Sequence, residues 1–306
     1  MYKLFRRVEH TVYNEDAKGD IKIATISDIH YSQLVTPKVL AIIFGKLASL
    51  NPDYITIAGD LLDSIDVLQE EELRSNILKF IQSLSTIAPV IISYGNHDFS
   101  SKKDGKWVFG WNGSFWGEVA SIPNVTIVDN SIYQDDKIFI SGYTQPFDFY
   151  FDDKRESLPV MLEELKSLKD DLLKPIVSLP RICMIHSPYR LTEPMISKYF
   201  KNYDLFLCGH MHEGMVPPIL DDVIRSNYGL IAPSKFLFPK NARGTIQTEY
   251  GQYIIISGGI TKISEESPKI LHPGNIFYPM SIEDITLTSD LEKVGYQKKI
   301  RYEGRK

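Results

Sequence analysis

Short, nearly uninterrupted apolar runs alternate with longer amphipathic segments over the first hundred residues of the chain. The runs at 21–26, 54–58 and 90–94 have the length and composition of strands that are buried on both faces. Between them, apolar positions recur at helical spacing over 37–50 and over 73–84. Strands that alternate with helices predict an α/β fold with a mainly parallel sheet.

The pattern is less regular after residue 120. It predicts short strands at 125–128 and 138–140, one helix near 155–171, and further strands at 182–185, 205–208, 253–257 and 282–287. Residues 214–250 contain few periodic apolar positions and are predicted to form a long loop. No Gly/Ser-rich or Pro-rich linker divides the sequence, so we expect a single domain over residues 1–306.

Composition favours a soluble globular protein over a disordered or membrane-spanning one. Of the 306 residues, 43% are hydrophobic and 24% are charged, and no apolar run approaches the roughly 18 residues of a membrane span. The net charge of −5 provides no global positive field to attract a nucleic-acid duplex. Both cysteines, Cys183 and Cys208, lie in apolar runs, which predicts buried thiols and a reducing, cytoplasmic location.

Basic residues gather at both ends of the chain. They are Lys3, Arg6 and Arg7 at the start, and Lys298, Lys299, Arg301, Arg305 and Lys306 at the end. Two interpretations stay open for these residues. They form solvated termini, or they make a peripheral contact with the anionic inner face of a membrane.

Polar residues with metal-binding side chains directly follow the predicted strands. They are Asp28 and His30, Asp60, Asn96 with His97 and Asp98, His186, and His210 with His212. Because parallel strands place their sites beyond their carboxyl ends, we expect these side chains to lie close together. Nitrogen and oxygen ligands without thiolates favour Mn, Fe or Zn. The pattern therefore predicts a transition-metal site.

The spacing within the motifs indicates two metal ions. Residues two apart on an extended segment point the same way, so Asp28 can act together with His30. His210 and His212 have the same spacing. A carboxylate can bridge ions about 3.5–4 Å apart, and Asp60, which ends its own strand, is the candidate bridge. Two divalent ions leave such a site net positive, which favours a phosphate group and acidifies water to a hydroxide nucleophile.

The order of these motifs resembles the calcineurin-like metallophosphoesterases. Asp28-x-His30, Gly59-Asp60, Gly95-Asn96-His97-Asp98, His186 and Gly209-His210-x-His212 match that family's motifs in order, over about residues 21–260. The resemblance implies a four-layer α/β/β/α sandwich of two packed sheets between helices, whereas periodicity alone suggests one doubly wound sheet. The opening Ile-Ser-Asp-Ile-His is similar to a bacterial, often membrane-associated branch. Residues 209–214 read Gly-His-Met-His-Glu-Gly where that branch often has Gly-His-Thr-His-Gly-Gly.

The resemblance also implies roles for individual residues. One metal ion would be held by Asp28, His30, Asp60 and His212, and the second by Asp60, Asn96, His186 and His210. His97 would face the substrate phosphate. Asp98 has two open interpretations, because it can orient His97 through a hydrogen bond or cap the turn. Asp63, His10 and His272 receive no role.

Aromatic residues gather in two segments beside the motifs. An insertion at about 99–121 contains all three tryptophans, Trp107, Trp111 and Trp116, and a second cluster contains Phe147, Phe149, Tyr150 and Phe151. Such clusters belong either to the core, or to a lid or interface that meets an apolar part of a substrate or a bilayer.

Together the motifs predict a phosphoesterase with two divalent transition-metal ions, in which a bridging hydroxide attacks phosphorus while Asn96, His97 and the metals stabilise charge. The substrate stays open between a lipid-linked or nucleotide-sugar phosphodiester, a cyclic nucleotide and a small phosphomonoester. The alternative is a non-catalytic scaffold that keeps the fold and binds a protein partner through its aromatic surface.

Overall fold

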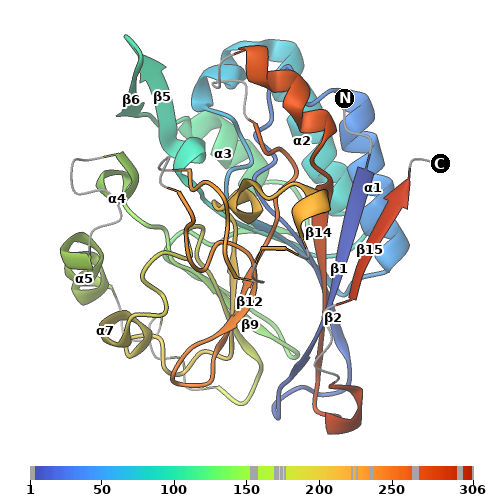
Figure 1. Ribbon diagram of the computed structural model, residues 1–306, viewed down its shortest axis with the longest axis vertical. Helices are drawn as coiled ribbons and strands as arrows, with labels where there is room; N and C mark the ends of the chain where they lie inside the picture. Colours follow the sequence, from blue (N-terminus) through green and yellow to red (C-terminus); the bar gives the residue numbers. More distant parts are fainter. Residues whose placement is uncertain are drawn as a thin grey trace.

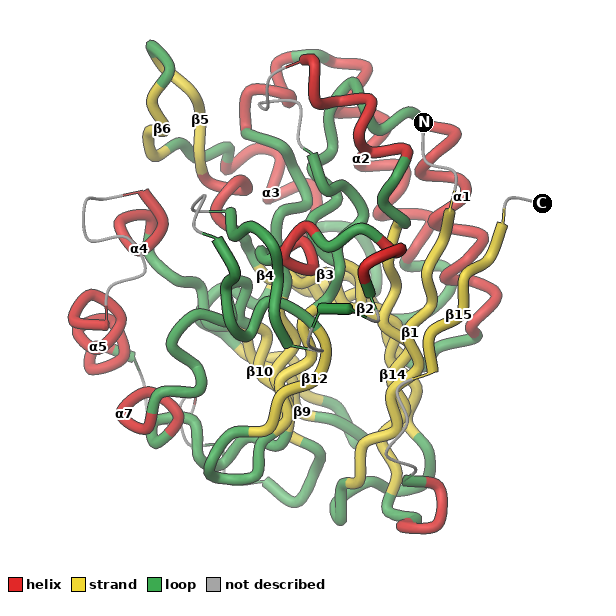
Figure 2. Tube along the Cα trace, viewed as in Figure 1, coloured by secondary structure: helices red, strands yellow, loops and turns green. Residues whose placement is uncertain are grey.

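Two β-sheets pack face to face, with helices on their outer sides, in a computed structural model of the chain (Figure 1, Figure 2). The structure describes residues 4–151, 158–168, 172, 175, 177–221, 223–224, 227–233, 237–263, 269–294 and 299–304. Helices α1 (Pro37–Leu50), α2 (Glu71–Leu84) and α3 (Gly113–Ala120) lie beside the larger sheet, and α4 (Phe147–Phe151), α5 (Leu158–Ser167) and α7 (Pro194–Ser197) lie beside the smaller one. This four-layer sandwich is the one that the family resemblance implied, and the single sheet suggested by periodicity is wrong.

The larger sheet has the strand order β15-β1-β14-β2-β3-β4-β7. Its strands are β1 (Leu4–Tyr13), β2 (Ile21–Ile26), β3 (Tyr54–Ala58), β4 (Val90–Ser93), β7 (Val125–Ile127), β14 (Met280–Thr288) and β15 (Lys299–Gly304). The run from β2 to β7 is parallel, whereas β14 is antiparallel to β2. The carboxyl ends of β2, β3 and β4 therefore meet along one edge.

The smaller sheet has the order β12-β13-β11-β10-β9-β8. Its strands are β8 (Ile132–Gln134), β9 (Phe139–Gly142), β10 (Arg181–Met184), β11 (Leu205–Cys208), β12 (Gly244–Gln247) and β13 (Tyr253–Ile256). The four central strands are parallel, and the edge strands β8 and β12 are antiparallel to their neighbours.

Shorter elements connect these layers. They are a hairpin of β5 (Ser100–Lys103) and β6 (Lys106–Phe109), and the 3-10 helices η1 (Ile65–Gln69), η2 (Asn96–Phe99), η3 (His212–Met215), η4 (Pro218–Leu220), η5 (Lys269–Ile276) and η6 (Leu291–Lys293). None of the helices that the structure describes is long and apolar enough to cross a membrane.

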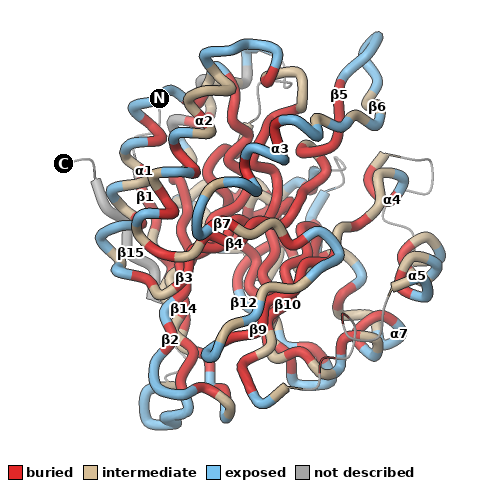
Figure 3. Tube along the Cα trace, turned by 180° about the vertical axis from the view of Figure 1, so that it is seen from behind, coloured by how far each residue is buried: buried red, intermediate tan, exposed pale blue. Residues whose placement is uncertain are grey.

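Alternation along the strands divides the buried residues between two cores. Ile182 and Met184 on β10 join the cluster between the sheets, whereas Cys183 between them joins the cluster beneath the outer helices. Ile91 and Ile92 on β4 divide in the same way. Because both faces of each sheet are covered, the central strands are buried over most of their length and consist of nearly continuous apolar runs (Figure 3). Both cysteines are buried thiols, as expected.

Strand β1 contains Arg6 and Arg7, two of the basic residues that were expected to be either solvated or in contact with a membrane. Arg6 is 2% exposed and pairs with Glu213, and Arg7 donates to Asp284 at 2.9 Å. Arg6 is therefore engaged within the protein, which corrects both interpretations of it, whereas the Arg7 side chain is paired and 29% exposed. Among the other basic residues, Lys3, Lys298, Arg305 and Lys306 lie outside the described residues.

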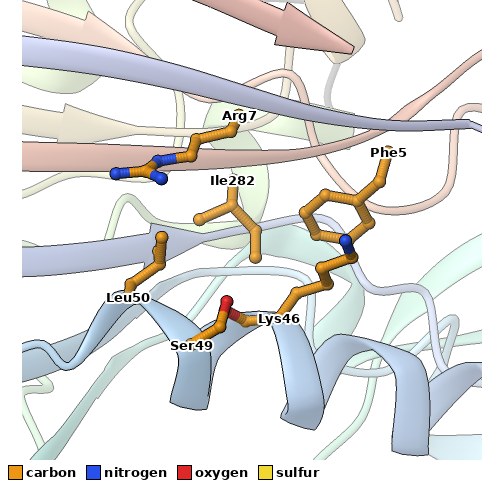
Figure 4. A pocket seen from close by; sticks show the side chains of 6 residues that line it. All are labelled: Phe5, Arg7, Lys46, Ser49, Leu50 and Ile282. Carbon is orange, nitrogen blue, oxygen red and sulfur yellow. The ribbon is translucent and has the colours of Figure 1, made fainter. Parts of the chain in front are cut away.

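A small pocket lies between α1 and the strands β1 and β14, and it contains none of the motif residues (Figure 4). It is lined by Phe5, Arg7, Lys46, Ser49, Leu50 and Ile282. The Lys46 ammonium group lies 5.6 Å from the centroid of the Phe5 ring. We regard this pocket as a packing feature of the helix against the sheet.

Candidate metal centre

The motif residues emerge at the carboxyl ends of parallel strands of both sheets. Asp28 and His30 follow β2, Asp60 follows β3, Asn96, His97 and Asp98 follow β4, His186 follows β10, and His210 and His212 follow β11. All of them are buried except His97 and His212, which are partly exposed. The sandwich thus brings residues separated by up to 184 positions together at the meeting point of its two sheets.

Their ligand atoms form three overlapping groups. These groups are Asp28, His30 and His212; Asp60, His186 and His210; and His30, Asp60 and His97, with the atoms of each group lying within 4.8 Å of one another. Asp60 belongs to two groups and lies between the others, since its Oδ2 is 3.0 Å from His186 Nε2 and 3.6 Å from His30 Nε2. A carboxylate in this position can contact two ions.

The turns off the strands adopt left-handed backbone conformations that L-residues rarely adopt. Asp28, His30 and Asp60 have φ values of 47°, 45° and 51°. Two neighbouring glycines make room for these turns. A Cβ at Gly59 would lie 2.3 Å from His186 Nδ1, and a Cβ at Gly95 would lie 2.3 Å from Asp60 Oδ1. The glycines that precede the ligands are therefore needed for close packing of the site.

Hydrogen bonds to Nδ1 fix the orientation of three imidazoles. Nδ1 of His30 pairs with Asp63 Oδ1 at 3.0 Å, that of His186 with the Ala58 carbonyl at 2.8 Å, and that of His212 with the Thr261 carbonyl at 2.8 Å. Such partners are typical of metal-binding histidines, because they set the tautomer and leave Nε2 for the ion.

Several atoms that face the site are unsatisfied. Within the described part of the chain, Nε2 of His30, Nε2 of His186 and Oδ1 of Asn96 are buried without a hydrogen-bond partner. Burying such atoms unpaired is unfavourable. Two imidazole nitrogens and an amide oxygen near Asp60 match the ligand types of a transition-metal site, so the residues present fit divalent cations.

The charges of the site are strongly coupled. Burial lowers the pKa of His30, but the hydrogen bond to Asp63 and the nearby carboxylates raise it to about 9. Burial likewise opposes protonation of His186, and the Asp60 carboxylate raises its pKa to about 9. Burial depresses the pKa of His212 to about 4. The carboxylates thus favour positive charge at the centre.

His97 lies at the rim of this cluster. Its Nδ1 is 2.5 Å from the Asp63 carbonyl oxygen, and its backbone N–H donates to Asp60 Oδ1 at 2.9 Å. The ring packs edge-on against His30 and Trp107, with centroid distances of 4.6 and 4.8 Å. His97 is therefore close enough to act on a group bound at the centre.

Asp98 points away from the histidine beside it. Its carboxylate accepts hydrogen bonds from the backbone N–H of Gly95 at 2.8 Å and of Leu62 at 3.0 Å, while His97 is held by Asp63. Burial and the charge of Asp60 raise the pKa of Asp98 to about 7. Of its two open interpretations, the geometry favours the turn cap.

Asp63 is the residue that the sequence interpretation left out. It is 2% exposed, and it serves His30 with its carboxylate and His97 with its carbonyl oxygen. Its place in the Gly-Asp-Leu-Leu-Asp run, three residues after Asp60, was the available signal. Tyr150 was also left without a role at the centre. Its ring lies 5.2 Å from that of His210, and its hydroxyl donates to Gln145 at 2.6 Å.

The geometry and the comparisons with known proteins agree on the class of protein. A family model described as calcineurin-like phosphoesterase matches residues 21–214. The chain therefore belongs to the calcineurin-like phosphoesterase family. That family implies divalent metal ions and a phosphoester substrate, and the described residues contain candidate ligand clusters for the ions.

Individual relatives are distant. The chain is 26% identical over 216 residues to a protein of Invertebrate iridescent virus 3 named "Putative phosphoesterase 078R", and the match covers 66% of this chain and 56% of the viral protein. The chain thus spans little more than half of that relative. The crystal structure of a dimetal phosphatase from Danio rerio covers 88% of this chain and 99% of its own, with 11% identity and a TM-score of 0.46.

Proposed function

We propose that the protein is a dinuclear metal-dependent phosphoester hydrolase. The observation that supports this most strongly is the set of overlapping ligand groups joined at His30 and Asp60, with buried ligand atoms that have no hydrogen-bond partner among the described residues. One ion would be held by Asp28, His30, Asp60 and His212, and the other by Asp60, Asn96, His186 and His210. When bound, such ions supply the positive charge that stabilises a phosphoryl group and lower the pKa of water.

The chain's own residues would position the reaction. Asp63 holds His30 and His97 in fixed orientations through two different oxygen atoms. With Nδ1 of His97 bonded to a carbonyl oxygen, its Nε2 carries a proton only in the imidazolium form. In that form His97 would donate a hydrogen bond to a phosphoryl oxygen or a proton to the leaving alkoxide.

The test is hydrolysis by the purified protein loaded with Mn²⁺, Zn²⁺ or Fe²⁺. We expect release of nitrophenol from bis-p-nitrophenyl phosphate or from p-nitrophenyl phosphate, and loss of that activity in Asp60→Asn. The exposed Glu163 on α5 offers a matched control, because Glu163→Gln removes a carboxylate charge outside the site. An inactive but metal-loaded protein would instead support the scaffold alternative, which no specific contact favours in the described part of the chain.

A further inference from the structure

A strip of aromatic side chains leads away from His97. Trp107 on β6 lies 4.8 Å from the His97 ring and 5.5 Å from the ring of Phe151 on α4. The ring centroids of Phe151 and Phe147 are 4.7 Å apart, and those of Phe147 and Phe109 are 6.1 Å apart. Trp107, Phe109, Phe147 and Phe151 form what we call the aromatic strip. The hairpin and α4 that carry it lie side by side at one edge of the molecule (Figure 1).

On α4, Phe147 and Phe151 are partly buried and pack against the core, whereas the hairpin residues of the aromatic strip are more exposed than the aromatic residues of the core. Phe115 and Trp116, from the same insertion, are 0% and 2% exposed, whereas Phe109 is 63% exposed and Trp107 is partly exposed. The insertion thus divides into a part that confirms the core interpretation and a part for which the lid or interface interpretation stays a prediction. Its helix packs into the core, and its hairpin holds aromatic surface open to solvent beside the candidate metal centre.

Hydrogen bonds fix the position of the base of the hairpin, so the aromatic surface is part of the ordered fold. Asp66 accepts hydrogen bonds from the Ser101 hydroxyl at 2.8 Å and from the Lys102 backbone N–H at 3.1 Å. The Gly110 backbone N–H donates to the Phe99 carbonyl oxygen at 3.0 Å, which joins the two ends of the hairpin. These bonds hold Trp107 at the rim of the centre without burying it.

Positive charge accompanies the aromatic strip. Lys102, Lys103 and Lys106 are exposed around the hairpin turn, and the Lys102 ammonium lies 5.7 Å from the centroid of the Trp107 ring. Apolar surface beside cations complements a molecule that has both an apolar chain and negative charge.

We infer that the aromatic strip binds the alkyl or acyl chain of a phosphoester substrate whose phosphate lies at the metal centre. The inference rests on the proposed function and adds the substrate class. Successive rings are inclined at 28°, 41° and 89°, so the aromatic strip presents an uneven apolar surface and not one flat face. A flexible chain can follow such an uneven surface. Continuity with His97 places its phosphate end at the centre.

The test uses p-nitrophenyl alkyl phosphates from methyl to decyl, each below its critical micelle concentration. The leaving group is the same throughout, so chain length reports on binding. We expect kcat/KM to rise by about twofold to fourfold per added methylene over part of the series. Trp107→Ala and Phe151→Ala should flatten this slope. Calorimetric affinity for n-alkylphosphonates should show the same dependence without turnover.

Tyr13→Ala is the matched control. Tyr13 is a 37% exposed aromatic residue, and the pairing of β1 with β14 places it near the amino end of β2, far from the centre. This variant should keep the wild-type slope. A flat wild-type series, or a rise seen only in micelles or vesicles, would overturn the inference, the latter in favour of a bilayer contact. Failure to hydrolyse the methyl ester, bis-p-nitrophenyl phosphate and p-nitrophenyl phosphate alike would overturn the proposed function, while the phosphonate affinities would still report on the strip.

Discussion

Asp63 connects the two kinds of histidine at the centre. Its carboxylate holds His30, a proposed metal ligand, and its carbonyl oxygen holds His97, the proposed substrate-facing residue. Partners of this kind raise the basicity of a metal-binding imidazole and fix its tautomer. The consequences of replacing the carboxylate should therefore differ between the two sets of ligands.

Asp63→Asn should weaken metal binding by on the order of 10–100-fold at the site that contains His30. Binding at the site that contains His186 should stay nearly unchanged. The amide keeps the size of the side chain but removes the negative charge that favours Nδ1–H. Competitive metal titration with a chromophoric chelator would resolve the two sites. Equal weakening of both sites would assign Asp63 a general structural role.

His97→Ala should keep the fold and the bound metals but lose on the order of 10²–10⁴ in kcat. If His97 donates a proton, the loss should be largest for esters with poor leaving groups and smaller for nitrophenolate. A uniform loss would indicate charge stabilisation instead. His272→Ala removes a histidine outside the motifs and serves as the control. A metal ion missing from His97→Ala would refute the assignment.

At the scale of elements, the sequence predicts the parallel strands and their helices well. The helix predicted at 37–50 has those bounds, and the strands at 21–26, 54–58 and 205–208 match residue for residue. The sequence predicts the bounds of these elements because their buried positions carry apolar residues. The ligand motifs follow from the same regularity, since they stand where the apolar runs end.

Other elements were missed for physical reasons. Strand β1 buries Arg6 and His10 on its inward side, where they meet Glu213 and Glu283, so its hydrophobic alternation is broken. Strand β12 lies within the segment predicted as a long loop, because it is a short edge strand with little apolar content. Nothing local in a sequence indicates that two buried charges will meet across 207 positions.

A substitution of Gly95 would test how closely the ends of strands β3 and β4 must approach each other. In Gly95→Ala, the added Cβ would lie 2.3 Å from Asp60 Oδ1 and 2.4 Å from the Asp60 backbone nitrogen, so the shared carboxylate must move. We expect loss of activity together with reduced metal content at both sets. In Gly45→Ala, on α1, the added Cβ meets no atom within 4 Å apart from its chain neighbours and its own helix backbone, so this variant should be slightly stabilising. A fully metal-loaded, active Gly95→Ala protein would contradict this packing argument.

At the scale of the whole molecule, the two sheets contribute complementary halves of the centre. The larger sheet supplies Asp28, His30, Asp60 and Asn96, and the smaller sheet supplies His186, His210 and His212. Metal ions bound between them would connect the sheets as well as perform chemistry. No segment of the sequence contains this arrangement by itself, and only the order of the motifs, matched to a family, predicted it.

Metal content tests the central claim most directly. Inductively coupled plasma mass spectrometry of natively purified protein should find close to two transition-metal ions per chain. His30→Ala should lower mainly one equivalent, whereas Asp60→Ala should lower both, because only Asp60 is proposed to contact both ions. Protein that contains only Mg²⁺ or Ca²⁺, or that takes up no more than one transition-metal ion when Mn²⁺ or Zn²⁺ is supplied in excess, would contradict the dinuclear assignment.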